Sequence, residues 1–418
     1  MIKAKGLQYR VSTGINYNSQ IFEASFNPEY VMAANNNYDT SVYFGRTTNG
    51  PYKRYFMGQS FANLKFKKYL LGFSNQNIWW GPGYQNSLLF SNNAPGFGHL
   101  HFSTQRPIST PLGHFEWQVI AGGLDQDTTL NSETAQLKLA RFTRKWRYVN
   151  GVVLSFQPKF IPGFYLGFTR ALQLYGNDND TTSLQFFEKY LPAVNAFFKK
   201  KINTQADAPG EVDGKDQVAS IFMRFLMPKN HFEFYLEYGY NDFKANIRDL
   251  IQDAQHSSAY IVGVKKIIPI KTKSFYSLNF EIVQMAQSAN YTVRNAGNWY
   301  VSGTIFQGFT HMNQILGAGS GVGNNIQSIN FEKVDDLKRY GLKVLRIQND
   351  PRGQFTNVNS LWLSNIAWND FVFGPSYQIK KNNFLINGEV LFVNSRNYFW
   401  LPKNKFNLNT SINIIYQW

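Results

Sequence analysis

The chain has 418 residues, enough for two or three ordinary domains or for one large closed sheet. Only 16% of its residues are charged, against roughly 25% in typical soluble domains. The net charge of +16 suits an anionic partner, but the longest basic run, Lys199 to Lys201, is too short to follow a nucleic-acid backbone. No stretch of about 20 apolar residues is present, which excludes a transmembrane helix.

The start of the chain and its cysteine content bear on its cellular location. Met1 to Lys5 shows no secretory signal peptide and leads directly into alternating polar and apolar residues. We therefore expect a mature or truncated chain. The absence of cysteine is consistent with an oxidising compartment.

Residues 79–97, WWGPGYQNSLLFSNNAPGF, combine two tryptophans, a Gly-Pro-Gly sequence and many small polar residues. Such a stretch fits a sugar-stacking platform, an anion-binding turn or a tight bend. Pro82 restricts its own φ angle, and the flanking glycines reach φ values barred to other residues. We therefore predict a rigid bend first of all.

Three histidines follow, His99, His101 and His114. His99 and His101 share a strand face, but no carboxylate lies at ligand spacing and no H-E-x-x-H motif is present. We predict polar lumen or interface positions for them and expect no metal and no cofactor. No G-x-S-x-G elbow or convincing Ser-His-Asp set is found either, so we do not expect an enzyme.

Two segments lack alternation, residues 177–216 and 286–323, and we predict long loops there. The first is acidic, then apolar and aromatic, then rich in Gly, Pro and Asp, and Pro192 interrupts its short helical stretch. The second runs into the glycine-rich ILGAGSGVGNN at 315–325. Its glycine spacing matches neither G-x-G-x-x-G nor a P-loop, which excludes nucleotide binding.

Period-two alternation is the clearest pattern in the chain. It covers HFEFYLEYGY at 231–240, SFYSLNFEIVQM at 274–285 and, most clearly, residues 406–418. In that last stretch the even positions from Phe406 to Trp418 are apolar apart from Thr410, and the odd positions are mostly amides and hydroxyls. Each run predicts a strand with unlike faces.

Two architectures use such strands, a soluble sandwich or barrel and an outer-membrane barrel. Runs of 10–14 residues, aromatic residues at the strand ends and an aromatic last residue favour the membrane barrel. We predict an all-β transmembrane antiparallel barrel of about 18 strands (16–18), a single domain over residues 1–418 with lumen-filling and extracellular loops. Residues 395–405 should be extracellular and the turn at 381–383 periplasmic.

Charged residues also fall on the predicted lumen face. These are Glu233, Glu237 and Glu281, and we expect Arg170, Arg224 and Arg346 to pair with them. Such charges usually hold a packed lumen together, and the alternative is the selectivity ring of a channel.

A family resemblance is carried by the segment at 79–97. Trp80-Gly81-Pro82-Gly83, Asn86-Ser87-Leu88-Leu89 and Ser91-Asn92-Asn93-Ala94-Pro95-Gly96 resemble the capsule-assembly Wzi family of outer-membrane proteins. Further similarity lies at Pro111-Leu112-Gly113, Phe115-Glu116 and Leu316-Gly317-Ala318-Gly319. The resemblance implies a non-enzymatic surface lectin in the bacterial outer membrane that binds capsular polysaccharide and assists capsule assembly or attachment.

The resemblance and the pattern together yield specific candidate residues. We predict that a segment folded into the lumen closes the pore through Gly81, Pro82, Gly83, Asn86, Ser91, Asn92 and Asn93. Aromatic stacking and basic residues would bind the polysaccharide, and the candidates are Trp79, Trp80, Arg106, Arg352, Trp362, Tyr398 and Trp400.

The expected partners are anionic capsular polysaccharide, outer-membrane lipid and lipopolysaccharide, with no nucleic acid and a monomeric barrel. Two alternatives stay open at this point. One is a channel for small solutes with an open lumen, and the other is a barrel hydrolase or acyltransferase.

Overall fold

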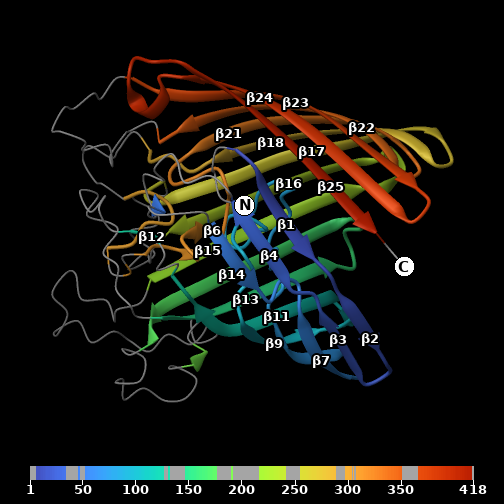
Figure 1. Ribbon diagram of the computed structural model, residues 1–418. Coiled ribbons are helices and arrows are strands. Elements are labelled where there is room, and N and C mark those ends of the chain that lie inside the picture. The colour runs from blue at the N-terminus through green and yellow to red at the C-terminus, as the bar shows by residue number, and fades with distance from the viewer. Residues whose placement is uncertain are drawn as a thin grey trace.

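The protein is described by a computed structural model. It covers residues 6–33, 46–47, 52–126, 130–131, 146–176, 190–191, 216–241, 255–288, 297–303, 305, 307–350 and 366–416. One antiparallel sheet of 18 strands wraps around the interior of the molecule (Figure 1). Within the described residues, no α-helix is long and apolar enough to cross a membrane.

The wall of the barrel is made by strands that pair with their neighbours in chain order. They are β2 (Ile15–Asn18), β3 (Phe22–Phe26), β7 (Phe61–Phe66), β8 (Tyr69–Ser74), β9 (His99–Thr104), β11 (Gly113–Leu124), β13 (Arg147–Pro158), β14 (Phe164–Tyr175), β15 (Asp216–Met227), β16 (Phe232–Asn241), β17 (Ser258–Lys271), β18 (Ser274–Gln284), β21 (Asn325–Asp335), β22 (Lys338–Asn349), β23 (Trp368–Lys381), β24 (Phe384–Arg396) and β25 (Lys405–Tyr416). The short β10 (Ile108–Ser109) pairs with β11. The predicted all-β barrel with about 18 strands is confirmed, although no ladder joins β25 to β2 in the described chain, so the sheet is not closed there.

The connections divide the barrel into two ends. At one end, which we call the turn rim, short turns such as 272–273, 336–337 and 382–383 join the strands. At the other, the loop rim, the connections are longer, and 397–404 contains the 3₁₀ helix η4 (Tyr398–Trp400). Strand β25, the last of the wall, ends at the turn rim (Figure 1).

The outward face of the wall is apolar, as the alternation predicts. Phe406, Leu408, Ile412 and Ile414 of β25 are 59–71% exposed. Aromatic pairs follow the wall near the turn rim: Phe66–Phe102, Phe115–Phe156, Tyr276–Phe331, Tyr340–Tyr377 and Phe384–Tyr416. Soluble monomers rarely expose such a surface, whereas a lipid-facing band with an aromatic girdle requires it.

Near the N-terminus the wall bends. Strands β1 (Gln8–Ser12), β4 (Glu29–Ala33) and β6 (Tyr52–Phe56) form a three-stranded sheet that continues β2, β3 and β7 toward the loop rim. Gly58 sits at the bend with φ +58°, bridged to Asn27, and a Cβ there would lie 2.2 Å from the Asn27 carbonyl oxygen. Only glycine fits this approach.

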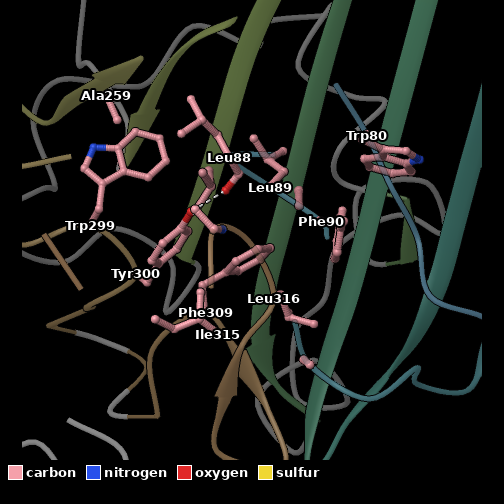
Figure 2. Close-up of a cluster of buried hydrophobic side chains, with 14 of the residues drawn as sticks. Trp80, Leu88, Leu89, Phe90, Ala259, Trp299, Tyr300, Phe309, Ile315 and Leu316 are labelled. Atoms are coloured by element: carbon pink, nitrogen blue, oxygen red, sulfur yellow. Dashed lines mark hydrogen bonds between the residues drawn. The ribbon is translucent and has the colours of Figure 1, made fainter. Parts of the chain in front are cut away.

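Two segments between wall strands fill the interior. The first inner segment is residues 75–98, between β8 and β9, and the second is residues 297–324, between β18 and β21, with the hairpin β19 (Thr310–His311) and β20 (Gln314–Ile315). Residues of both segments and inward-facing wall residues form the main hydrophobic core of the described chain (Figure 2). The second segment lies within the stretch predicted as a long loop at 286–323. The other predicted loop, 177–216, lies almost entirely outside the described residues.

Small elements complete the described chain. Strand β5 (Arg46–Thr47) pairs with β12 (Leu130–Asn131), and the 3₁₀ helix η2 (Pro228–Asn230) forms the turn between β15 and β16. The η2 turn contains no buried residue.

Candidate functional site

The first inner segment is held to the wall by two carboxylates. Glu281 of β18 accepts hydrogen bonds from the backbone N–H of Tyr84 (2.7 Å) and Gln85 (3.1 Å) and from the Asn86 side-chain amide (2.9 Å). Glu237 of β16 is fully buried and accepts one from the Leu88 N–H at 3.3 Å. The irregular backbone at 84–88 leaves N–H groups without strand partners, and these carboxylates satisfy them.

Tryptophan Trp80 is part of this packing. It is 3% exposed, its indole N–H donates to Gln118 Oε1 at 2.9 Å, and its ring lies edge-on to Phe90. The next turn is compact, since a Cβ at Gly83 would lie 2.0 Å from the Asn86 carbonyl oxygen. The predicted bend at 81–83 therefore exists, and Trp80 has no ring face open for a sugar.

The second inner segment is held by a buried cation. Arg147 of β13 is 1% exposed, and its guanidinium donates to the carbonyl oxygens of Gly308 and Thr310, both at 2.7 Å, and to Gln173 Oε1 at 3.0 Å. Next to it, His311 Nδ1 accepts from the Asp125 N–H at 3.1 Å. Burial, together with the nearby Arg147 charge, lowers the pKa of His311 to about 3.

The two inner segments also bind each other. The Ser91 N–H donates to Leu316 O at 2.7 Å, and its hydroxyl donates to Gly317 O at 2.6 Å. The Tyr300 hydroxyl donates to Leu88 O at 2.9 Å, and Figure 2 shows the two residues side by side. A Cβ at Gly317 would lie 2.2 Å from Leu88 O, so the glycine-rich stretch allows close backbone approach rather than nucleotide binding.

A polar hollow lies between the first inner segment and the three-stranded sheet. Its volume is about 90 Å³, and it is lined by Arg10, Glu29, Val31, Tyr52, Phe56, Gly58, Gln59, Asn77, Asn92–Gly96 and Gln314. Gln59 and Asn77 bond to each other (2.7 Å), and the Asn77 amide donates to Ala94 O (2.7 Å). Arg10, with a side chain 55% exposed, stands 3.8 Å from Glu29. Amides, a cation and aromatic rings in one hollow suit polyhydroxylated ligands.

At the loop rim, Tyr398 and Trp400 pack around Trp368. The Trp368–Trp400 rings are T-shaped at 5.0 Å, and the Trp400 indole N–H donates to Asp350 O at 3.2 Å. Tyr398 is 9% exposed and carries Lys405 Nζ 4.1 Å from its ring centroid. Both predicted sugar-stacking rings are thus enclosed by neighbouring side chains.

The remaining predicted binding residues are spread over the molecule. Trp79 is half-buried in the first inner segment, whereas Arg106 is exposed between β9 and β10 at the turn rim, opposite to Tyr398. Arg352 and Trp362 lie outside the described residues. The structure therefore does not bring the seven candidates into one site.

The predicted lumen ion pairs are right in one case and wrong in two. Arg224 pairs with Glu233 at 2.5 Å. Arg170 and Arg346 face outward, because they alternate with inward neighbours, and they bind Gln217 and Gln327 instead. Glu237 and Glu281 accept hydrogen bonds from the inner segment, a role the sequence pattern did not reveal because it depends on a distant segment.

The histidines occupy polar positions. His101 bonds to Asn63 Oδ1 at 2.9 Å, His99 to Phe97 O at 2.8 Å, and His114 to Ser109. Over the described part of the chain, no group of His, Cys, Asp or Glu is arranged to hold a metal ion.

Comparison with known proteins now adds the family. The sequence matches the family described as capsule assembly protein Wzi over residues 4–330. The chain belongs to the Wzi family. This Wzi-family match ends within β21, and the barrel continues through β25.

The fold was also compared with solved structures. The fold is similar to Wzi of Escherichia coli, described as an outer membrane protein involved in group 1 capsule assembly and a carbohydrate-binding β-barrel, with a TM-score of 0.67 and 12% identity over 97% of this chain and 77% of that one. OccAB4 of Acinetobacter baumannii is also similar, with a TM-score of 0.45 and 7% identity over 98% of this chain and 90% of that one. No curated protein matches the sequence.

Proposed function

We propose that this protein is an outer-membrane barrel that binds anionic capsular polysaccharide at its loop rim and assists capsule assembly, without catalysing a reaction. Family membership and the fold shared with a carbohydrate-binding barrel support this proposal. The apolar outward face supports a membrane location, and in such barrels the longer loops lie outside the cell. We infer that the loop rim lies on the outside of the cell and that the barrel acts as a monomer.

The filled lumen is the observation that carries the proposal. The two inner segments bind the wall through Glu281, Glu237 and Arg147 and bind each other through Ser91 and Tyr300. A channel for small solutes needs a continuous polar path, whereas here buried Leu, Phe and Trp side chains occupy the interior. A barrel with a filled lumen fits a surface binding protein better than a transporter.

We propose the polar hollow as part of the polysaccharide site. Asn92 is exposed, Gln314 is half-buried, and neither side chain makes a hydrogen bond within the described residues, so their amides are available to sugar hydroxyls. Arg10 reaches the same hollow and can pair with a uronate carboxylate. Arg352 and Trp362 stay candidates, and the enclosed rings of Trp80, Tyr398 and Trp400 would then support the site without stacking on sugar.

Binding of a purified uronate-containing capsular polysaccharide to the refolded barrel tests this proposal. We expect saturable binding that weakens as salt is raised, and a loss of about tenfold or more in the Arg10→Gln, Asn92→Ala, Gln314→Ala triple variant. The matched control is Arg106→Gln, which removes one exposed arginine at the other rim. It should bind as the parent does.

Two outcomes would overturn the proposal. The parent barrel fails to bind and shows steady single-channel conductance, which would identify a channel. Alternatively, Arg106→Gln abolishes binding and the triple variant does not, which would place the site at the turn rim.

A further inference from the structure

An outward-facing polar patch lies on four adjacent strands just below the loop rim. Strands β21 to β24 lie side by side there (Figure 1). In the middle of each strand the outward positions are apolar, and the last one or two before the loop rim are polar. We call this set the outer polar patch, and it consists of Gln327, Arg346, Gln348, Asn369, Asn394 and Arg396.

The strand register places these residues on the outward face. Val344 and Leu342 are 43% and 37% exposed, and Arg346 is next in the same alternating series on β22. Phe371 and Phe373 are 40% and 49% exposed, and Asn369 continues their series on β23. Arg346 pairs across the ladders with Gln327 and Phe371, and Arg396 with Asn369. Paired residues in antiparallel strands share a face, so the patch borders the lipid-facing band.

The arginines in the patch are held in place but not neutralised. Arg346 Nη1 donates to Gln327 Oε1 at 2.8 Å, and Nη2 donates to Asn369 Oδ1 at 3.1 Å. Arg396 lies over the Phe371 ring, 5.5 Å from its centroid. Among the described residues, no carboxylate forms an ion pair with either guanidinium, and the patch itself contains no acidic residue.

Free donors remain on both arginines. A guanidinium has five N–H donors in a planar fork, and the two amide bonds of Arg346 leave three of them. Arg396 is exposed and makes no side-chain hydrogen bond within the described residues. Two cations supported by amides, directly above an apolar band, match a ligand with acyl chains and phosphate groups.

We propose that the outer polar patch binds the phosphates of lipid A, the phosphorylated glycolipid of the outer leaflet, while its acyl chains lie on the phenylalanines of β23 and β24. This inference rests on the proposed function for its orientation, because the loop rim must face the outer leaflet. If the barrel had the opposite orientation, this patch would lie in the inner leaflet and meet phospholipid instead. The hollow proposed for polysaccharide is lined by the three-stranded sheet and the two inner segments, and it shares no residue with the outer polar patch, so the two sites are separate.

The test is lipid binding to the purified full chain in detergent, measured by native mass spectrometry. Bisphosphorylated lipid A is compared with its dephosphorylated form, on the parent and on an Arg346→Gln, Arg396→Gln double variant. We expect the double variant to bind bisphosphorylated lipid A at least tenfold more weakly, and the parent to bind the dephosphorylated lipid equally weakly. The matched control is Lys271→Gln, Lys273→Gln, which removes two exposed cations at the turn rim and should stay within twofold of the parent.

Several results would overturn the inference. These are equal binding by the parent and the double variant, equal losses in the control, or full competition by phosphatidylglycerol. The single variant Arg396→Gln keeps the test valid if the double variant fails to fold, because the Arg396 side chain is exposed and makes no hydrogen bond in the described chain. Its affinity for bisphosphorylated lipid A should fall about threefold. Polysaccharide binding by the same variants should be unchanged, which separates this inference from the proposed function.

Discussion

The two inner segments are held to the same wall by opposite charges. The first segment places N–H groups against the wall, and the carboxylates of Glu281 and Glu237 accept hydrogen bonds from them. The second places carbonyl oxygens there, and Arg147 donates to them. Each charge is buried on the inward face of its strand.

The comparison shows how a β-wall accommodates irregular backbone in its interior. A buried main-chain group without a partner costs about 1–3 kcal/mol, and strand ladders cannot supply partners to a segment that crosses the lumen. Charged side chains reach several such groups at once and bind them more strongly than neutral ones do. The sign of the wall charge therefore follows from which main-chain groups the segment leaves unpaired.

The largest effect is expected from Glu281→Ala. The change removes the acceptor of the Gln85 N–H and of the Asn86 amide, and it leaves the Tyr84 N–H only the Tyr235 hydroxyl at 3.3 Å. We expect a loss of about 3–5 kcal/mol of unfolding free energy. Urea unfolding in detergent measures it, and single-channel recording should detect conductance as the first segment detaches. Glu116→Ala, which removes an exposed carboxylate on β11, is the control. A closed and equally stable Glu281→Ala barrel would contradict the role of this carboxylate.

Removing the cation that holds the second segment should lower the free energy of unfolding somewhat less. Arg147→Met keeps the volume but loses both bonds to carbonyl oxygens, and we expect a loss of about 3 kcal/mol. Amide hydrogen exchange should accelerate at 308–316 and not at 84–88. Arg147→Lys, which keeps the charge without the planar fork, should lose less. Faster exchange in both segments would mean that they detach together.

Acid should weaken the second segment through His311. Its pKa is about 3 in the folded protein and 6.5 without burial, so the unfolded chain takes up a proton first as pH falls. The stabilising contribution is complete above pH 6.5 and is lost as pH falls toward 3, by about 2 kcal/mol between pH 7.5 and pH 5. His311→Gln should remove that part of the pH dependence in urea titrations at both pH values. If the variant and the parent lose the same free energy of unfolding between the two pH values, His311 does not titrate in this range.

The smallest effects concern the contact between the two segments. Ser91→Ala loses the hydroxyl bond to Gly317 O and should cost about 1–2 kcal/mol. Asn92→Ala, one residue along, removes an exposed side chain without a hydrogen bond in the described chain, and should change stability by less than about 0.5 kcal/mol. Urea unfolding of the two variants side by side distinguishes them. Equal losses would mean that Ser91 does not join the segments.

Only part of the candidate site was accessible from the sequence. The bend at Gly81–Gly83 was predicted because Pro82 fixes its own φ angle and the flanking glycines reach φ values barred to other residues. The aromatic candidates were harder to judge. Trp80, Tyr398 and Trp400 are found among other rings and amides, and no local pattern distinguishes an enclosed ring from an open one. Arg10 and Gln314 were missed because they meet Asn92 only through folding.

By itself the sequence determined the all-β class, the strand positions and the apolar outward face, because side-chain alternation in a strand is a local property with period two. Tertiary structure alone decided which segments fill the lumen, that Glu281 and Arg147 hold them, and that Arg346 faces outward rather than toward Glu281. These depend on strand register and on contacts between residues some 200 positions apart in the chain, such as Ser91 and Gly317, for which the sequence separation is 226. Backbone groups that leave the strand ladders find their partners only where the tertiary fold brings them together, and the periodicity of the sequence does not show which partners these are.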